Sequence, residues 1–277
     1  MRTKLISLLL CFFFCDGIAH ASSVEYQVKT IAYKNLVGKL YLPASATKVP
    51  VVIAFGGSDG GMNFGEANGA MIAPNGIAVL ALAYFKETGL PEKLDHIPME
   101  YFISAIDYLE TETAVDPARI GVVSGSRGSE AAFLLAIHDA RIKSVAVTTP
   151  SNVVWNGPTE ADAAWTFQGK NIPGLILPDG DRKTQVSRFL TALENQQNLQ
   201  TVRFALEKVN GPILLVSAEN DQIWPSLPMS QDILRYLNER KFKHPVTHKS
   251  YPTGHGFSKE SAPEIKQSII DHFLRTL

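Results

Sequence analysis

Cysteine is nearly absent from this 277-residue chain: it occurs only as Cys11 and Cys15, and no cysteine follows. Beyond that point a disulfide framework, a thiolate nucleophile and a cysteine-ligated metal are therefore excluded. The chain also lacks a strong excess of either charge, because 26 basic residues face 27 acidic ones for a net charge of −1. This balance, with no basic run, argues against nucleic acid as a partner. Any nucleophile in the body of the chain must be an oxygen.

Long apolar runs are also scarce, and the most hydrophobic one lies at the N-terminus. Two basic residues precede an apolar stretch over residues 5–14, and Ala19-His20-Ala21 offers a small-x-small cleavage site. The pattern predicts a secretory signal peptide over 1–21 rather than a structural helix. The apolar stretch is shorter than a helix that crosses a bilayer normally is. A lipid-modified Cys15 is disfavoured by the three bulky phenylalanines before it. We therefore expect an exported protein, periplasmic or secreted, with no membrane span and no cysteine after cleavage.

The rest of the chain alternates between strand-like and helix-like segments. With 45% hydrophobic residues, it is large enough for one sizeable core. Continuous apolar strands are typical of a parallel sheet that is covered on both faces. The sequence predicts one α/β domain over 22–277, with a mostly parallel sheet and helices on both faces. The expected strands are an N-terminal hairpin (24–33 and 39–42), then 50–55, 77–84, 120–123, 144–149, 212–217 and 246–251; the expected helices are 66–74, 98–111, 130–137, 226–240 and a last one ending at 277.

Residues 150–210 break this alternation. They contain Trp155, Trp165, several prolines and glycines and the polar stretch TALENQQNLQ, and they offer no clear strand. An insertion before the last two strands would lie above the carboxyl edge of the sheet, where open α/β folds bind ligands. We predict a lid or cap here; the alternative is a disordered linker, which the tryptophans and a helical stretch disfavour.

A serine lies at a turn between a predicted strand and a predicted helix. Residues 124–128 read Ser-Gly-Ser-Arg-Gly, which fits small-x-Ser-x-Gly, a variant of the nucleophile elbow. In that motif Ser126 is the exposed hydroxyl, and Ser124 and Ser129 are packing residues. On these residues alone, a phosphate-binding or merely tight turn is an equal alternative.

A base and an acid follow later strands in a suitable order. His255 lies in the glycine-flanked loop after the strand at 246–251, and Asp221 follows the strand at 212–217. Glu219 is the rival acid, because it is nearer the strand end. The order Ser126, Asp221, His255 in the chain is that of α/β-hydrolases. It favours a catalytic triad over a phosphate-binding or merely tight turn at Ser126.

A glycine-rich loop supplies the remaining requirement, donors for an oxyanion. The segment FGGSDGG follows the strand at 50–55, where such folds place a backbone N–H from Gly57. The other donor is the amide of Arg127, next to the nucleophile. A P-loop is disfavoured because the segment lacks the Gly-Lys-Ser/Thr ending. The predicted chemistry requires no cofactor and no metal ion.

The chain resembles the C-terminal catalytic domain of acyl-CoA thioesterases and bile acid-CoA:amino acid N-acyltransferases, within the dienelactone-hydrolase group. The likeness spans roughly residues 50–257. Position by position, it implies that Ser126 is the nucleophile, Asp221 the acid and His255 the base. The cysteine nucleophile of the amino acid acyltransferases is absent, which favours hydrolysis. The matching stretches are FGGSDGG, ALAYF, YFISAIDYL, GVVSGSRGSEAAFLLA, AWTFQGKNIP, GPILLVSAENDQIWPS and YPTGHGF.

The chain departs from the family in two respects. A short hairpin over 24–42 stands where the family has a β-sandwich domain, and an exported protein would meet little CoA. We therefore expect a serine hydrolase that cleaves a small-molecule acyl ester or thioester through an acyl-enzyme. Carboxylesterase, lactone hydrolase or peptidase activity on the same fold stays open, as does a non-catalytic binding protein.

Overall fold

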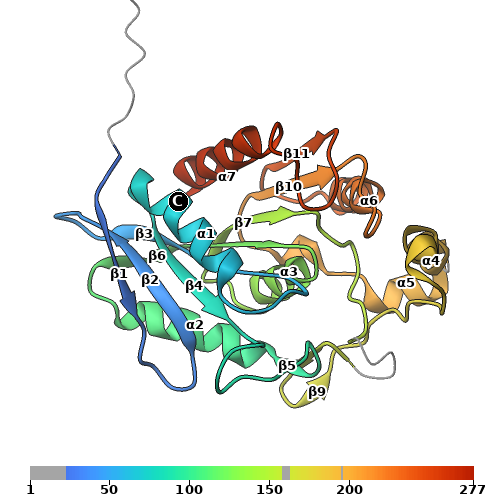
Figure 1. Cartoon of the computed structure of the whole chain (residues 1–277), viewed down its shortest axis with the longest axis horizontal. Coiled ribbons are helices and arrows are strands. Elements are labelled where there is room, and N and C mark those ends of the chain that lie inside the picture. Colours follow the sequence, from blue (N-terminus) through green and yellow to red (C-terminus); the bar gives the residue numbers. More distant parts are fainter. Residues whose placement is uncertain (1–22, 158–162, 195) are drawn as a thin grey trace, which may run out of the picture.

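A mostly parallel sheet of eight strands forms the centre of the molecule. The computed structural model describes residues 23–157, 163–194 and 196–277, so the predicted signal peptide over 1–21 lies outside the described residues. The strand order is β1-β2-β4-β3-β6-β7-β10-β11, antiparallel at β1-β2-β4 and parallel beyond (Figure 1). The bounds are β1 (Tyr26–Thr30), β2 (Val37–Pro43), β3 (Val49–Phe55), β4 (Ala78–Ala83), β6 (Val115–Gly125), β7 (Ile142–Thr148), β10 (Ile213–Ala218) and β11 (Val246–Tyr251).

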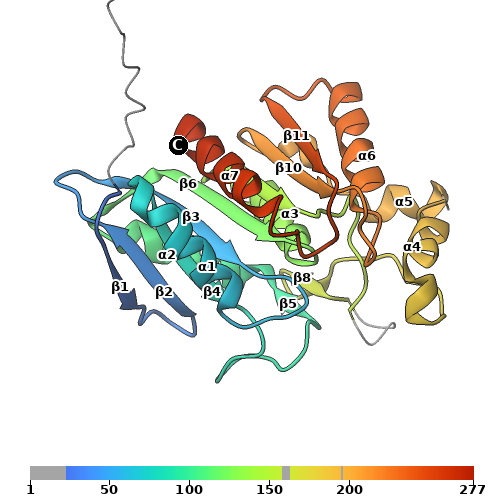
Figure 2. The same ribbon diagram turned by 45° about the horizontal axis from the view of Figure 1, so that its top comes forward.

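Helices cover both faces of this sheet, which confirms the predicted fold class. Helices α1 and α7 lie on one face, and α2, α3 and α6 lie on the other (Figure 2). Because successive side chains of a strand point to opposite faces, Val52 and Ala54 pack under α1 and α7, whereas Val51 and Ile53 pack against the other layer. The bounds are α1 (Asn63–Ile72), α2 (Met99–Thr111), α3 (Gly128–His138), α6 (Ser226–Glu239) and α7 (Ala262–Thr276), with 3₁₀ turns η1 (Ala73–Asn75) and η3 (Leu206–Lys208).

The segment between β7 and β10 has more structure than the sequence indicates. The expectation of no strand there is wrong: β8 (Trp165–Phe167) and β9 (Lys170–Asn171) join β5 (Ile97–Pro98) in a small second sheet. Strands of two or three residues are too short to produce a periodic apolar pattern. The 3₁₀ turn η2 (Arg182–Thr184) and helices α4 (Gln185–Glu194) and α5 (Gln196–Val202) follow, at the end of the molecule far from β1 (Figure 1).

This segment divides between two cores. Val153, Trp155, Leu175 and Phe189 form a separate apolar cluster with Trp224 and Met229, at the start of α6. Trp165 and Phe204 instead pack into the main core. The described part of the predicted insertion over 150–210 thus forms a small second core together with the start of α6. Trp165 and Phe204 also attach it to the main core. Among the described helices, none has the length and apolar character that crossing a bilayer requires.

Helix α1 approaches the sheet closely through two glycines. A Cβ on Gly65 would lie 2.8 Å from the carbonyl oxygen of Ala54, and one on Gly69 would lie 2.6 Å from the ring of Tyr41. Neither distance leaves room for a methyl group. This close contact fixes the direction in which the loop over 56–61 enters α1, and that loop belongs to the site described below.

We predict that Gly69→Ala lowers the free energy of unfolding by about 1–3 kcal/mol, because the methyl group would displace the Tyr41 ring. Helix propensity alone predicts the opposite, a gain of about 1 kcal/mol. The matched control is Ala67→Gly on the exposed face of α1, which should cost about 1 kcal/mol through propensity. Urea unfolding of both variants measures this; a more stable Gly69→Ala protein would refute the close packing.

Candidate active site

Ser126 lies on a strained turn between β6 and α3. Its φ of 54° is in the left-handed region, which non-glycine residues rarely adopt. Its amide donates to the carbonyl of Thr148 at 2.9 Å, and its own carbonyl accepts the Ser129 amide at 2.9 Å. Such strain persists only when surrounding contacts fix it, and it is concentrated at functional sites. The turn presents the Ser126 hydroxyl at the carboxyl edge of the sheet.

Small neighbours make this turn sterically feasible. A Cβ on Gly128 would lie 2.2 Å from the carbonyl oxygen of Gly56, and one on Gly125 would lie 2.5 Å from the Thr148 hydroxyl. Ser124 and Ser129 are fully buried. The Ser124 hydroxyl donates to the carbonyl of Phe55, and that of Ser129 donates to the carbonyl of Ser126, both at 2.7 Å. Their hydroxyls therefore hold the turn together and do not face solvent.

His255 and Asp221 converge on Ser126. The Nε2 atom of His255 lies 2.9 Å from the Ser126 hydroxyl oxygen, and Nδ1 lies 2.9 Å from both carboxylate oxygens of Asp221. The Asp221 side chain is only 2% exposed, so few waters compete for it. Because β10 and β11 are neighbours in the sheet, the loops after them bring residues 221 and 255 together.

The surroundings of Asp221 keep it ionised. Burial by itself raises the pKa of this carboxyl, but hydrogen bonds from His255 and Ser226, together with the imidazole charge, outweigh burial and hold the pKa below its ordinary value. The Ser226 hydroxyl donates at 2.7 Å, and the amides of Ile223 and Trp224 add two bonds. An ionised Asp221 accepts the Nδ1 proton of His255, which leaves Nε2 free to accept the serine proton.

Glu219, the rival acid, lies outside this arrangement. Strand β10 ends at Ala218, and the Glu219 side chain is exposed and accepts the hydroxyl of Ser250 at 2.8 Å. The structure thus brings Ser126, Asp221 and His255 together and directs Glu219 towards the surface of β11.

The two predicted oxyanion donors lie side by side. A Cβ on Gly57 would lie 3.2 Å from the Arg127 amide nitrogen and 3.1 Å from the Ser126 Cβ, so the glycine loop touches the elbow directly. Within the described part of the chain, neither amide is paired with another backbone or side-chain acceptor. The Tyr84 hydroxyl donates to the carbonyl of Gly56 at 2.9 Å and fixes the loop. The Arg127 amide also lies at the N-terminus of α3, where the helix dipole favours negative charge.

An ion pair that the sequence pattern does not predict lies in the first turn of α3. The Arg127 Nε atom lies 3.2 Å from Glu130 Oε1, and Glu130 is fully buried. Burial raises the pKa of Glu130 to about 7, although the Arg127 charge and hydrogen bonds from Trp165 and Trp155 oppose the shift. One signal was available: a glutamate opening the otherwise apolar run Ala-Ala-Phe-Leu-Leu-Ala must be buried with a partner.

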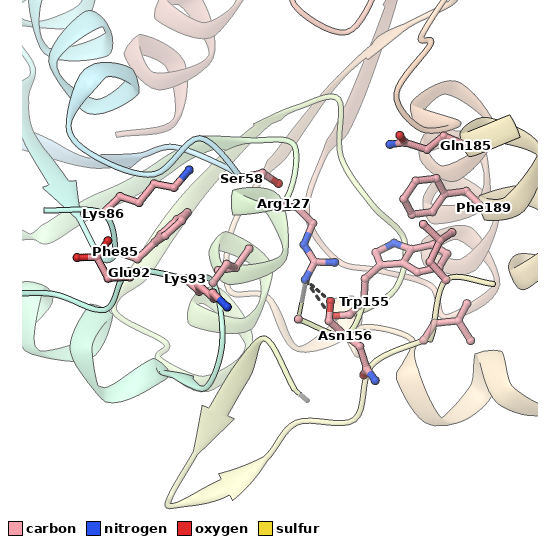
Figure 3. A pocket seen from close by; sticks show the side chains of 14 residues that line it. Ser58, Phe85, Lys86, Glu92, Lys93, Arg127, Trp155, Asn156, Gln185 and Phe189 are labelled. Atoms are coloured by element: carbon pink, nitrogen blue, oxygen red, sulfur yellow. Dashed lines mark hydrogen bonds between the residues drawn. The ribbon is translucent and has the colours of Figure 1, made fainter. Parts of the chain in front are cut away.

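This ion pair connects the segment over 151–210 to the turn at Ser126. The Arg127 Nη2 group donates to the carbonyls of Trp155 and Asn156 at 3.0 and 2.9 Å. Glu130 Oε2 accepts the Trp155 amide at 3.2 Å and the Trp165 indole N–H at 2.9 Å. Figure 3 shows Arg127 pointing from α3 to this stretch of chain.

A cavity of about 470 Å³ opens beside Arg127 (Figure 3). One side is formed by the loops after β3 and β4, and the other by the 151–210 segment. Most of its lining is apolar, and the side chains that provide this lining are Phe85, Leu94, Trp155, Leu175, Leu177 and Phe189. Among the described residues, no group of three or more His, Cys, Asp or Glu side chains is arranged to hold a metal ion. The arrangement is suited to acyl transfer through a serine.

Comparison with known proteins finds a matching family model and similar sequences. Residues 97–270 match the family model described as BAAT / acyl-CoA thioester hydrolase C terminal. An acyl-coenzyme A amino acid N-acyltransferase 1 from Mus musculus is 32% identical over 191 residues, covering 68% of this chain and 44% of the relative. Acyl-coenzyme A thioesterase 6 from Homo sapiens is 28% identical over 236 residues, covering 83% and 54%. The chain thus spans about half the length of these curated relatives.

Solved structures show the same fold. A dienelactone hydrolase-like promiscuous phosphotriesterase from metagenomic libraries superimposes with a TM-score of 0.59 at 11% identity, covering 91% of this chain and 98% of that one. A puromycin-hydrolyzing peptidase from Mycobacterium tuberculosis superimposes with a TM-score of 0.63 at 15% identity, covering 94% and 40%. At these identities the likeness concerns the fold alone.

We predict that Asp221→Asn folds normally and loses roughly a hundredfold or more in kcat, because the amide cannot hold the His255 tautomer or stabilise its charged form. Glu219→Gln is the matched control on the exposed side and should lose less than roughly tenfold. Turnover of the best ester substrate, after circular dichroism has established folding, compares the two. An inactive Glu219→Gln beside an active Asp221→Asn would move the acid to Glu219.

Proposed function

This chain belongs to the BAAT / acyl-CoA thioester hydrolase C-terminal family, and we propose that it is a serine hydrolase that cleaves an ester or thioester through a covalent acyl-enzyme. One observation carries the proposal: the hydroxyl oxygen of Ser126, on a strained turn, lies 2.9 Å from an imidazole nitrogen of His255 whose other nitrogen contacts a buried carboxylate. Backbone strain of this kind is concentrated at functional sites, and an imidazole held between a hydroxyl and a carboxylate is the arrangement that activates a serine.

The proposed reaction has two halves. The Ser126 oxygen attacks the carbonyl carbon while His255 Nε2 takes the serine proton, and the amides of Gly57 and Arg127 stabilise the negative oxygen. Each such donor is typically worth about 3 kcal/mol in the transition state. His255 then gives the proton to the leaving alcohol or thiol, and the acyl group stays on Ser126. A water then attacks the acyl carbon while His255 takes its proton, the bond to the Ser126 oxygen breaks, and His255 returns the proton to that oxygen as the acid leaves.

Hydrolysis is favoured over transfer to an amine by the nucleophile itself. The relatives include both thioesterases and amino acid N-acyltransferases. The family resemblance implies a cysteine nucleophile in the amino acid acyltransferases, whereas this chain has no cysteine after Cys15 and the nucleophile that the resemblance implies is Ser126. We therefore propose water as the acceptor, with an acyl ester or thioester as the substrate class.

We also propose that the protein is exported, on the strength of the N-terminal pattern alone. Little CoA is available outside a cell, so the physiological substrate would then be another ester or thioester. We expect the exported protein to begin at Ser22, because Ala19-His20-Ala21 is the well-placed cleavage site. Intact-mass measurement on the exported protein tests this; a retained Met1, or a lipid adduct on either cysteine, would contradict it.

We predict that a fluorophosphonate probe labels the wild-type protein covalently and that Ser126→Ala abolishes both labelling and nearly all turnover. Ser124→Ala is the matched control. The Ser124 hydroxyl is buried and donates to the carbonyl of Phe55, so this variant should still be labelled and keep most of its activity. Peptide mapping of the adduct identifies the labelled serine. A panel of p-nitrophenyl esters, acyl-CoAs and lactones then defines the substrate. A wild-type protein that neither labels nor turns over any of them would be a binding protein instead.

A further inference from the structure

The cavity beside Arg127 lies on one particular side of the catalytic serine. Its lining includes Arg127, whose amide is one of the two predicted oxyanion donors, and Ser58, which follows Gly57, the other donor. It includes no residue from 221–224 or 254–257, the loops that carry the acid and the base. The cavity therefore adjoins the chain at both predicted oxyanion donors, and its lining contains neither the acid nor the base.

We propose that this cavity binds the acyl part of the substrate, leaving the alcohol or thiol outside it, and that Leu177 sets the acyl length that fits. This inference rests on the proposed serine hydrolase function. The leaving atom must lie near His255 Nε2, because it takes its proton from there. With the carbonyl oxygen on the Gly57 and Arg127 amides, the remaining substituent of the carbonyl carbon extends away from His255 and into the cavity.

The walls define the chemical class of that acyl group. Apolar side chains line both sides of the cavity: Phe85 and Leu94 on one side, and Trp155, Leu175 and Phe189 on the other. The cavity volume of about 470 Å³ is within the ordinary range for small-molecule sites. The charged residues of the lining, Lys86, Glu92, Lys93 and Arg127, include both signs. We infer an apolar acyl group, extended or ring-bearing and considerably larger than acetyl.

Hydrogen bonds and ring contacts hold together the wall that Trp155, Leu175 and Phe189 form, which we call the distal wall. The Asn156 amide donates to the carbonyl of Leu175 at 3.0 Å, and the Leu175 amide donates to Val154 at 2.8 Å. Phe189 packs edge-on against Trp155 at 4.6 Å between ring centroids and against Trp224 at 5.9 Å. The buried Arg127–Glu130 pair holds the main chain of Trp155 from below.

A matched pair of residues lies on the two sides of this wall. Leu177 lines the cavity and is partly buried. Ile176, the preceding residue, is 57% exposed and lines a separate groove on the other side. A tryptophan at 177 would fill the cavity, whereas a tryptophan at 176 would add the same bulk outside it.

The experiment measures kcat/KM for p-nitrophenyl acetate, butyrate and octanoate on wild type, Leu177→Trp and Ile176→Trp. We expect Leu177→Trp to lower the octanoate-to-acetate ratio roughly tenfold or more, because added bulk excludes the long chain and spares the short one. Ile176→Trp should leave the ratio within about twofold of wild type. Leu177→Ala, which leaves the cavity larger, is measured in parallel in case the tryptophan variant does not fold; it should change the same ratio by raising the KM for octanoate.

A second arm holds the acyl group constant and varies the leaving group, using the butyrate esters of p-nitrophenol and 1-naphthol. If Leu177→Trp changes this ratio and leaves the acyl ratio alone, the cavity binds the leaving group and the proposal is overturned. Unchanged ratios for both position-177 variants overturn it as well. A wild-type protein that hydrolyses no ester and takes no fluorophosphonate refutes the proposed function itself, a result distinct from an active enzyme with unaltered acyl selectivity.

Discussion

The left-handed turn at Ser126 is the constraint on which the rest of the site depends. A non-glycine residue in this conformation costs on the order of 1–3 kcal/mol, so neighbouring contacts must hold it. The Ser126 amide bonds to Thr148 on β7, and Gly128 lies against the carbonyl of Gly56 with no room for a Cβ. Because the turn presses against the β3 loop, the act of presenting the hydroxyl also brings the Gly57 and Arg127 amides together.

Parallel strand order explains why three side chains so distant in sequence meet. In the main sheet, β3, β4, β6, β7, β10 and β11 are parallel and point their carboxyl ends to one edge. The turn after β6 and the loops after β10 and β11 carry Ser126, Asp221 and His255 to that edge. The antiparallel β1 and β2 extend the sheet at the far end and contribute nothing to this edge. The sheet thus fixes the positions of the three side chains through its register, and local hydrogen bonds set their orientation.

The amino-acid pattern predicts the centre of the main sheet well because strands such as β3, β4 and β10 are buried and form continuous apolar runs. The same reasoning fails at β8 and β9, whose two or three residues carry no periodicity. It also kept Glu219 as a rival to Asp221 for the role of the acid. Side chains alternate between the two faces only within a strand, and β10 ends at Ala218, before both residues. The Arg127–Glu130 pair went unnoticed because its partners, Trp155 and Trp165, come from a segment whose path the sequence does not indicate.

Arg127 joins the two parts of the proposed enzyme. Its amide belongs to the oxyanion site on the main sheet, whereas its guanidinium holds the segment that forms the distal wall of the cavity. A buried ion pair adds little net stability, because desolvation offsets the attraction, but removing one partner typically costs about 3–5 kcal/mol. The main effect of the Arg127–Glu130 pair is therefore to position the main chain of Trp155, and it adds little to the net stability of the fold. One residue thus contributes its amide to the proposed oxyanion site and its guanidinium to the main chain of Trp155 and Asn156, which form part of the cavity wall.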